Sequence, residues 1–331
     1  MTEMLNDLQN SIRQVMADQA NGSDESQCWQ QLNELGWLLV GVPEEYDGLG
    51  AGLAGMSMVV REMAQRVSCA PVLPALVAVD AIVNSSLKDK PELLSRFVSG
   101  ELVSCSLTAS ELTYQNGKIS GSIRAVQSAD VASELLVWNH SLSFLALVEV
   151  NREGVEMRST PTWDVTRRLF DVKFDEVEVD SSRVITTSRD QIERVLGTLD
   201  FLVGADSIGT AEGVFAMTLE HLKVREQFSR PLAMFQALKH RCADIKTQLV
   251  AAESLLADKL ASSDVLAAGA CIKQFSTSSA SWIAEDCLQL HGGVGMAAEH
   301  DCHLFLKRAS LNAHLAHTES EVTQILLADL V

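Results

Sequence analysis

The segment VREQFSRPLAMFQALKHRCADIK, residues 224–246, gathers positive charge at what its pattern predicts to be the junction between two helices. Its basic residues are Arg225, Arg230, Lys239, Arg241 and Lys246, and its acids are Glu226 and Asp244. The whole chain carries a formal net charge of −18. Basic residues concentrated in one segment of so acidic a protein indicate a site for a small, local anion.

Length and composition predict a soluble globular protein. The chain has 331 residues, of which 47% are hydrophobic and 21% are charged. A chain of this length is too large for one simple core, so two or three structural units are expected. The net charge of −18 argues against nucleic acid as the main partner, because phosphate binding needs a basic face.

Nothing in the sequence predicts export or a membrane. The N-terminus MTEMLNDLQN is polar and acidic, unlike a signal or transit peptide. The longest uncharged apolar stretches, such as VSCAPVLPALVAV from Val67, contain prolines and are too short to span a bilayer. We therefore expect a cytoplasmic protein whose seven cysteines are buried thiols rather than a disulfide framework.

The segment EHDCH raises the question of a metal, because it contains His300, Cys302 and His303. A zinc site needs three or four ligands, usually with a second cluster elsewhere in the chain. The sequence shows no such second cluster. The favoured interpretation is a solvated helix end, and no metal is predicted.

The chain is predicted to have an α+β fold of three parts. Residues 1–100 are expected to be a helical domain, because LNDLQNSIRQVMADQA, ESQCWQQLNELGWLLVGV (25–42) and GAGLAGMSMVVREMAQRV have apolar residues three and four apart. Residues 101–187 are expected to be a small antiparallel β domain, with alternating segments such as GKISGSIRAV and FDVKFDEVEV and a hairpin turn at QNGKI. PEEYDGLGAG between two of the helices is predicted to be a loop.

Residues 188–331 are expected to be a helical bundle, because Pro231 is their only proline. After Gln236, apolar residues recur at steps of four and three, which is typical of a helix that packs in a bundle. The stripe consists of Leu238, Cys242, Ile245, Leu249, Ala252 and Leu256. Together with the apolar segment VLAAGACI that follows it, this stripe offers more apolar helix surface than one bundle is expected to bury, which favours a dimer or a dimer of dimers.

Three motifs in this order resemble the acyl-CoA dehydrogenase family. REQFSRPLAMFQ (225–236) is similar to the family's Arg-x-x-Phe-Gly…Phe-Gln element, and QLHGGVG (289–295) to its Gln-x-x-Gly-Gly-x-Gly element. PEEYDGLG (43–50) is similar to the N-terminal Pro-Glu-x-Tyr-Gly-Gly-x-Gly loop. Together they span most of the chain. The resemblance implies an N-terminal helical domain, a central β domain and a C-terminal four-helix bundle.

The resemblance also implies FAD, an acyl-CoA substrate and an electron-transfer acceptor. In this family the bundle helices hold FAD, whose pyrophosphate lies across a subunit boundary. Guanidinium donors and closely approaching backbone suit a dianionic pyrophosphate. By this resemblance the cofactor-binding residues are Arg225, Gln227, Phe228, Phe235, Gln236, Gln289, Leu290, His291, Gly292, Gly293 and Thr318.

The catalytic carboxylate of the family is missing from both of its usual positions. One position falls on Leu199, and the other falls on Ala316 if Thr318 matches the family's threonine. His317 is a candidate base because the ordinary pKa of histidine is near 6.5. Asp206 is a second candidate, two helical turns beyond Leu199 on nearly the same face.

The β domain departs from the family as well. The family's Thr-Glu-Pro segment corresponds to Thr108-Ala109-Ser110, and its Trp-x-Thr to Ala125-Val126-Gln127. In these features the chain resembles the short subunits of the bacterial α2β2 branch that acts on sterol side chains, in which a homologous partner completes the site. A homodimer or homotetramer, a scaffold without flavin, and a flavin oxidase or monooxygenase remain alternatives.

Overall fold

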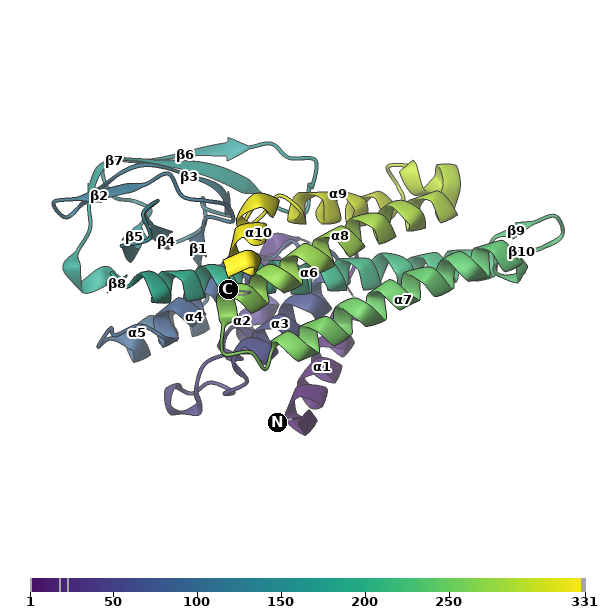
Figure 1. Ribbon diagram of the computed structural model, residues 1–331, viewed down its shortest axis with the longest axis horizontal. Coiled ribbons are helices and arrows are strands. Elements are labelled where there is room, and N and C mark those ends of the chain that lie inside the picture. Colours follow the sequence, from purple (N-terminus) through teal and green to yellow (C-terminus); the bar gives the residue numbers. More distant parts are fainter. Residues whose placement is uncertain (1, 18, 23, 329–331) are drawn as a thin grey trace.

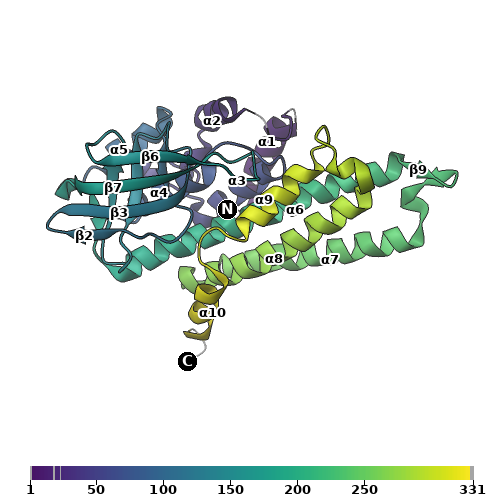
Figure 2. The same ribbon diagram turned by 90° about the horizontal axis from the view of Figure 1, so that it is seen from above.

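The computed structural model describes residues 2–17, 19–22 and 24–328, and it shows helices, then two small sheets, then long helices (Figure 1). The predicted α+β fold, with a helical N-terminal part and a C-terminal bundle, is confirmed. Seen from above, the sheets lie at one end and the long helices extend from them to the other (Figure 2). Within the described residues, no helix is both long and apolar enough to cross a membrane.

The N-terminal part consists of short helices around one buried helix. The expected helix over residues 25–42 is shorter than predicted, because Gly36 adopts a left-handed conformation (φ 67°) and only a 3₁₀ turn, Trp37–Leu39, follows it. The fourth helix is buried on nearly all sides, which explains its uniformly apolar sequence. The helices are α1 (Thr2–Ala17), α2 (Glu25–Glu34), α3 (Gly52–Ala64), α4 (Val72–Val83) and α5 (Lys90–Val98).

The β domain contains two four-stranded sheets. All strand pairs are antiparallel except β1 with β4, which is parallel. Asn116 and Gly117 have φ of 52° and 79°, so QNGKI forms the predicted hairpin turn. One sheet has the order β1 (Val103–Cys105), β4 (Glu134–Trp138), β5 (Leu145–Glu149), β8 (Val184–Thr186), and the other β2 (Thr113–Gln115), β3 (Lys118–Gln127), β7 (Leu169–Glu178), β6 (Val155–Thr160).

The C-terminal part is organised along one helix of 36 residues, α6 (Arg189–Val224). At 1.5 Å per residue this helix is about 54 Å long, and it runs from the sheets to the far end of the molecule (Figure 1). Beside it pack α7 (Gln236–Lys259), α8 (Val265–His291) and α9 (Cys302–Asn312), and α10 (Glu319–Ala328) packs against α8.

Close packing of α6 against α8 depends on two glycines. A Cβ atom on Gly269 would lie 2.2 Å from the carbonyl oxygen of Gly197, and one on Gly197 would lie 2.5 Å from that of Val265. Both separations are far below van der Waals contact, so any larger residue would push the helices apart.

The apolar stripe on α7 is confirmed as a packing face, but it is used within the chain. Ile245, Leu249, Ala252 and Leu256 are all buried against the other bundle helices. The stripe therefore leaves little apolar surface for a second subunit. Any contact between subunits would have to involve surfaces other than this stripe.

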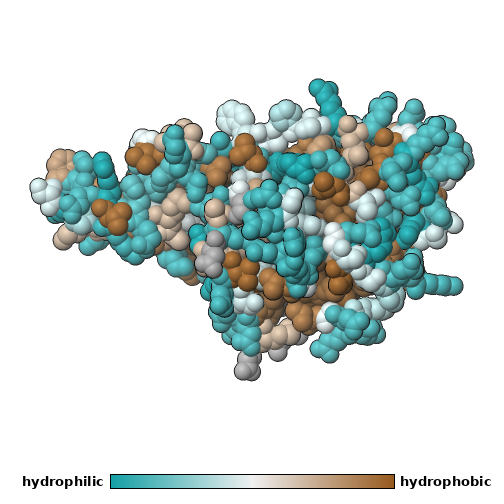
Figure 3. Space-filling model, turned by 180° about the vertical axis from the view of Figure 1, so that it is seen from behind, coloured by the Kyte–Doolittle hydropathy of each residue, from teal (hydrophilic) through white to brown (hydrophobic). Residues whose placement is uncertain are grey.

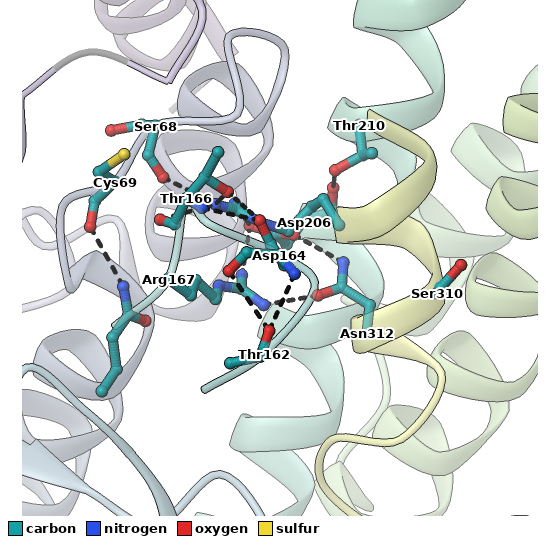
Figure 4. Close-up of polar contacts among 12 residues, drawn as sticks. Ser68, Cys69, Thr162, Asp164, Thr166, Arg167, Asp206, Thr210, Ser310 and Asn312 are labelled. Carbon is teal, nitrogen blue, oxygen red and sulfur yellow. Dashed lines mark hydrogen bonds and ion pairs between the residues drawn. The ribbon is translucent and has the colours of Figure 1, made fainter. Parts of the chain in front are cut away.

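A cluster of buried charges joins the β domain to the bundle (Figure 4). Arg167 lies 2.8 Å from Asp206 on α6, and Arg308 on α9 lies 2.8 Å from Asp164 and 3.5 Å from Asp206. Asn312 donates to the second oxygen of Asp206 at 2.6 Å. All four charged side chains are at most 5% exposed, and two positive charges face two negative ones.

Removing one charge from this cluster should destabilise the fold strongly. Arg308→Met leaves two buried carboxylates with a single guanidinium, and breaking a buried pair costs about 3–5 kcal/mol. Arg189→Met is the control, because Arg189 forms an exposed pair with Glu193 on the same bundle, and such pairs contribute about 1 kcal/mol or less. Urea unfolding of both variants measures the difference, and equal losses would contradict a structural role for the cluster.

Candidate functional site

A small pocket lies where the β domain, the start of α6 and the segment between α9 and α10 meet. Its volume is about 130 Å³. Leu199 and Ala316, the two positions predicted for the missing glutamate, both line it, although 117 residues separate them in sequence. The remaining lining residues are Thr108, Ala109, Ser110, Trp138, His140, Leu142, Leu196, His317 and Glu321.

His317 lies in this pocket and forms a pair with a buried carboxylate. Its Nδ1 lies 2.6 Å from Oδ2 of Asp200, and its backbone N–H donates to Oδ1 of Asp200 at 3.2 Å. A carboxylate only accepts, so Nδ1 carries the proton of this contact. Nε2 has no hydrogen-bond partner among the described residues. The sequence places Asp200 about 100° from Leu199 around α6, and that direction leads to His317.

The pKa of His317 is raised above its ordinary value. Burial would lower it, but the hydrogen bond to Asp200 and the charge of Asp200 outweigh burial, with a further contribution from Glu321. The buried Lys273 of α8 donates to the carbonyl oxygen of His317 and fixes the backbone of the same residue. The contact with Asp200 therefore stabilises the imidazolium form relative to that of an unpaired histidine.

Glu321 is a pocket carboxylate that the sequence reasoning missed. It accepts from the backbone N–H and the hydroxyl of Thr318, both at 2.7 Å, in a capping box at the start of α10. The Thr-x-x-Glu spacing was visible in the sequence. Burial would raise the pKa of Glu321, but these hydrogen bonds hold it below the usual range, which makes Glu321 a weak base. Thr318, predicted to bind the cofactor, caps this helix.

Asp206 does not line the pocket. It belongs to the buried charge cluster, where Arg167, Arg308 and Asn312 surround it. A carboxylate held between two guanidinium groups has no free path to a substrate proton. The structure therefore brings His317 to the two base positions and leaves Asp206 away from them.

Apart from Thr318, the predicted cofactor residues lie at the opposite end of the bundle. A short hairpin, β9 (Glu226–Gln227) with β10 (Arg230–Pro231), carries the first motif and projects beyond the helices (Figure 1). Seen from behind, this end is a narrow arm, mostly hydrophilic, with separate hydrophobic patches (Figure 3). Phe228 at the turn is 87% exposed. Phe235 is partly covered by Arg230, whose guanidinium lies 4.0 Å from the ring centroid.

The second motif meets the first at this end. The rings of His221, near the end of α6, and His291, at the end of α8, have centroids 4.5 Å apart. Leu290 and His291 are buried, whereas Gln289, Gly292 and Gly293 are exposed. A Cβ atom on Gly292 or Gly293 would meet nothing within 4 Å, so their backbone is open to an approaching group.

Three of the five basic residues in segment 224–246 have no acidic partner within the described part of the chain. Arg241 pairs with Asp286, and Lys246 lies 3.8 Å from Glu253. No salt bridge is recorded for Arg225, Arg230 or Lys239, all of which are exposed. The exposed glycine backbone and these free cations fit the diphosphate part of a dinucleotide.

A second and larger hollow, of about 820 Å³, lies between α2, the end of α5 and loops of the β domain. Trp29, Asn33, Val131 and Arg168 are among the residues that line it. It contains none of the residues predicted to be catalytic or to bind the cofactor. Its size therefore does not make it the candidate site.

Comparison with known proteins identifies the class that this fold and these motifs define. Family models described as the N-terminal and C-terminal domains of acyl-CoA dehydrogenase match residues 3–101 and 191–326. The chain belongs to the acyl-CoA dehydrogenase family, whose members are flavin oxidoreductases.

Two relatives and two solved structures show how far the similarity extends. Acyl-CoA dehydrogenase IpdE2 of Mycobacterium tuberculosis is 29% identical over 97% of this chain and 91% of its own, and IpdE2 of Mycolicibacterium smegmatis is 28% identical over 91% and 87%. The Tcur3481-Tcur3483 steroid ACAD G363A variant has a TM-score of 0.87 at 24% identity, covering 99% of this chain and 98% of that one. The ChsE4-ChsE5 complex from Mycobacterium tuberculosis has a TM-score of 0.89 at 20% identity, covering 100% and 98%.

The contact with Asp200 predicts that the pKa of His317 is higher than that of an unpaired histidine. In NMR titrations, the His317 ring should titrate above its ordinary pKa in the unaltered chain, and Asp200→Asn should lower that pKa. Glu321→Gln should lower it less, because Glu321 acts only through its charge. Because folding raises the pKa of His317, the contact with Asp200 stabilises the folded protein fully below about pH 6.5. This stabilisation is lost as the pH rises through the raised pKa of the folded state. An ordinary histidine pKa for His317 in all three proteins would contradict the pairing of His317 with Asp200.

Proposed function

We propose that this chain is one subunit of an FAD-dependent acyl-CoA dehydrogenase, in which a homologous partner completes the site. The observation that carries the proposal is the distance between the two halves of the site. Leu199 and Val224 are 25 residues apart on one helix, which is about 38 Å. The pocket and the dinucleotide motifs of a single chain are thus too far apart to act together. Two subunits packed in opposite directions would bring one chain's hairpin to the other's pocket.

The size of the pocket supports the same proposal. Pockets that enclose a whole ligand usually measure roughly 300–1,000 Å³, whereas this one measures about 130 Å³. The chain on its own offers space for a short acyl segment but not also for a flavin ring. The exposed backbone of Gly292 and Gly293 and the unpaired Arg225, by contrast, suit the diphosphate end of FAD. One chain therefore offers groups for the diphosphate of FAD but no space for its flavin ring.

The reaction requires a base that removes the α-proton of the acyl thioester, while bound FAD supplies the acceptor for the β-hydride. Leu199 and Ala316 provide no such group. We assign the base to the partner chain, because Ala125 and Gln127 stand where the family has its flavin-ring residues, so this chain's own flavin-ring pocket departs from the family as well. In this arrangement His317, with Nδ1 held by Asp200, stays a polar group in a mostly apolar wall and orients what enters the pocket.

Two of the similar structures support a substrate class and an assembly for this chain. One similar structure is titled a steroid ACAD and another a complex of two chains, which supports a sterol-derived acyl-CoA and an α2β2 assembly. Electrons would pass to a separate electron-transfer acceptor. A flavin-free scaffold would purify colourless, and an oxidase would consume oxygen without any acyl-CoA. A homo-oligomer in which His317 is the base is the remaining alternative.

One experiment tests the proposal directly. The chain is expressed alone and together with the product of the neighbouring gene, and each preparation is measured for mass and flavin content. We expect a stable hetero-oligomer with tightly bound FAD only from co-expression. A monomer in both preparations would overturn the proposal, as would a flavin-loaded homo-oligomer with full activity.

The identity of the base predicts the outcome of His317→Ala. If the partner supplies it, dehydrogenase activity appears only in the co-assembled protein, and His317→Ala keeps most of its kcat. Even when it is supplied with FAD, the chain alone should be slower by at least the roughly 10²–10⁴-fold that a positioned base usually contributes. If His317 were the base, its neutral form would be required, so activity would rise with pH through its raised pKa and disappear in His317→Ala. Steady-state rates across pH separate the two.

The hairpin predicts where flavin affinity resides. Arg225→Ala removes an ionic hydrogen bond to phosphate, worth roughly 1.5–3 kcal/mol, so flavin affinity should fall by roughly 10–150-fold. Lys223→Ala is the matched control, because Lys223 is an exposed cation on the last turn of α6 that pairs with Glu220. Flavin retention after dialysis of the co-assembled protein measures both. Equal retention in the two variants would remove Arg225 from the site.

A further inference from the structure

We infer that His291, His300 and Cys302 bind a divalent transition metal of the zinc type, between the end of α8 and the start of α9. One ring nitrogen of each histidine and the sulfur of Cys302 lie within 4.8 Å of one another. The sequence showed only two of these three ligands, His300 and Cys302. The fold supplies the missing ligand from the preceding helix. His303, the third member of the EHDCH segment, does not belong to the group.

The hydrogen bonds of His291 leave one nitrogen available. Its Nδ1 lies 2.9 Å from the carbonyl oxygen of Cys287, which can only accept, so Nδ1 carries the proton. Nε2 is then an acceptor, and it is buried without a hydrogen-bond partner. Histidines that bind metals typically donate their other N–H to a backbone carbonyl in this way. A buried lone pair without a donor needs an electrophile.

His300 and Cys302 offer the other two ligand atoms. Nδ1 of His300 accepts a long hydrogen bond, 3.2 Å, from the backbone N–H of Cys302, which holds the ring beside that residue. The sulfur of Cys302 lies 3.6 Å from Nδ1 of His291. In a tetrahedral zinc site, neighbouring ligand atoms are roughly 3.3–3.7 Å apart. Binding therefore requires the three groups to move closer together and the His291 ring to turn, because the nitrogen nearest the sulfur is Nδ1 and the free nitrogen is Nε2.

The loop between the ligands permits this movement. Gly292–Met296 forms a single 3₁₀ turn that contains three glycines, and most of its residues are exposed. A fourth ligand position is open to water or to His221, whose ring lies against that of His291. Binding replaces the Cys302 S–H bond with a sulfur–metal bond and releases one proton to solvent.

An ordinary hydrophobic-core histidine explains the cluster less well. The recorded hydrogen bonds of His291 and His300 go to backbone and sulfur atoms rather than to a carboxylate, unlike His317 with Asp200. The three rings of His221, His291 and His300 instead pack on one another, with centroids 4.5 and 4.8 Å apart. A metal would join the ends of α8 and α9 and fix the backbone of Gly292 and Gly293.

Cobalt(II) titration of the purified full-length chain tests this inference without any measurement of dehydrogenase activity. We expect one cobalt per chain, with a sulfur-to-cobalt charge-transfer band and the visible absorption of a tetrahedral site. Zinc should displace the cobalt. Cys302→Ser should abolish the charge-transfer band, and His300→Gln should weaken binding by more than the roughly 10–100-fold that follows loss of an outer-shell partner.

Matched variants guard against general metal binding and against misfolding. Cys271→Ser changes a partly exposed cysteine outside the cluster, and His303→Gln changes a histidine next to it, so both variants should bind cobalt like the unaltered chain. Far-ultraviolet circular dichroism confirms that each variant is folded. The inference is overturned if cobalt does not bind, or if Cys302→Ser and His300→Gln bind it as well as their controls do.

Discussion

The buried charges of Asp164, Arg167, Asp206 and Arg308 fix the position of the β domain against the bundle, and the candidate site depends on that position. The cluster connects the loop before β7 to α6 and α9. Asn312, which ends α9, bonds to the same Asp206, and the chain reaches the pocket four residues later. Once α9 is held there, Ala316 and His317 face the side of α6 that carries Leu199 and Asp200.

The straight helix α6 has the two parts of the candidate site at its opposite ends. At one end it carries an apolar pocket wall, and at the other it leads into a basic hairpin beside the glycines that follow α8. Since the helix is rigid over about 38 Å between Leu199 and Val224, no loop movement within one chain can join the two ends. A second subunit is the simplest way to bring such ends together, and it needs no apolar stripe on α7. In such an assembly the hairpin of one subunit would contact the pocket of the other.

Local features of the fold could be predicted from the sequence, and long-range contacts could not. The Asn116-Gly117 hairpin and the stripe on α7 depend on neighbouring residues and a fixed period, and both are present. Strand β6 was not predicted, because Val155 and Met157 are its only apolar residues and most of the strand is exposed. The partner of His317 is 117 residues away at Asp200, and Asp206 lies 102 residues from Arg308. Only the fold decides which of two similar aspartates meets a histidine and which meets arginines.

The turn of the hairpin argues that this part of the chain is shaped for a contact outside it. Phe228 and Ser229 have φ of 53° and 61°, although neither is glycine, and such backbone costs of order 1–3 kcal/mol per residue. The same turn leaves Phe228 87% exposed, which forgoes the roughly 1.5–3 kcal/mol that burying an aromatic ring provides. Within the described chain, only the ring of Phe235, 6.2 Å away, makes a recorded ring contact with it. Both costs are offset when a cofactor or a second subunit covers the ring, so the hairpin is better explained as half of an interface than as a surface loop.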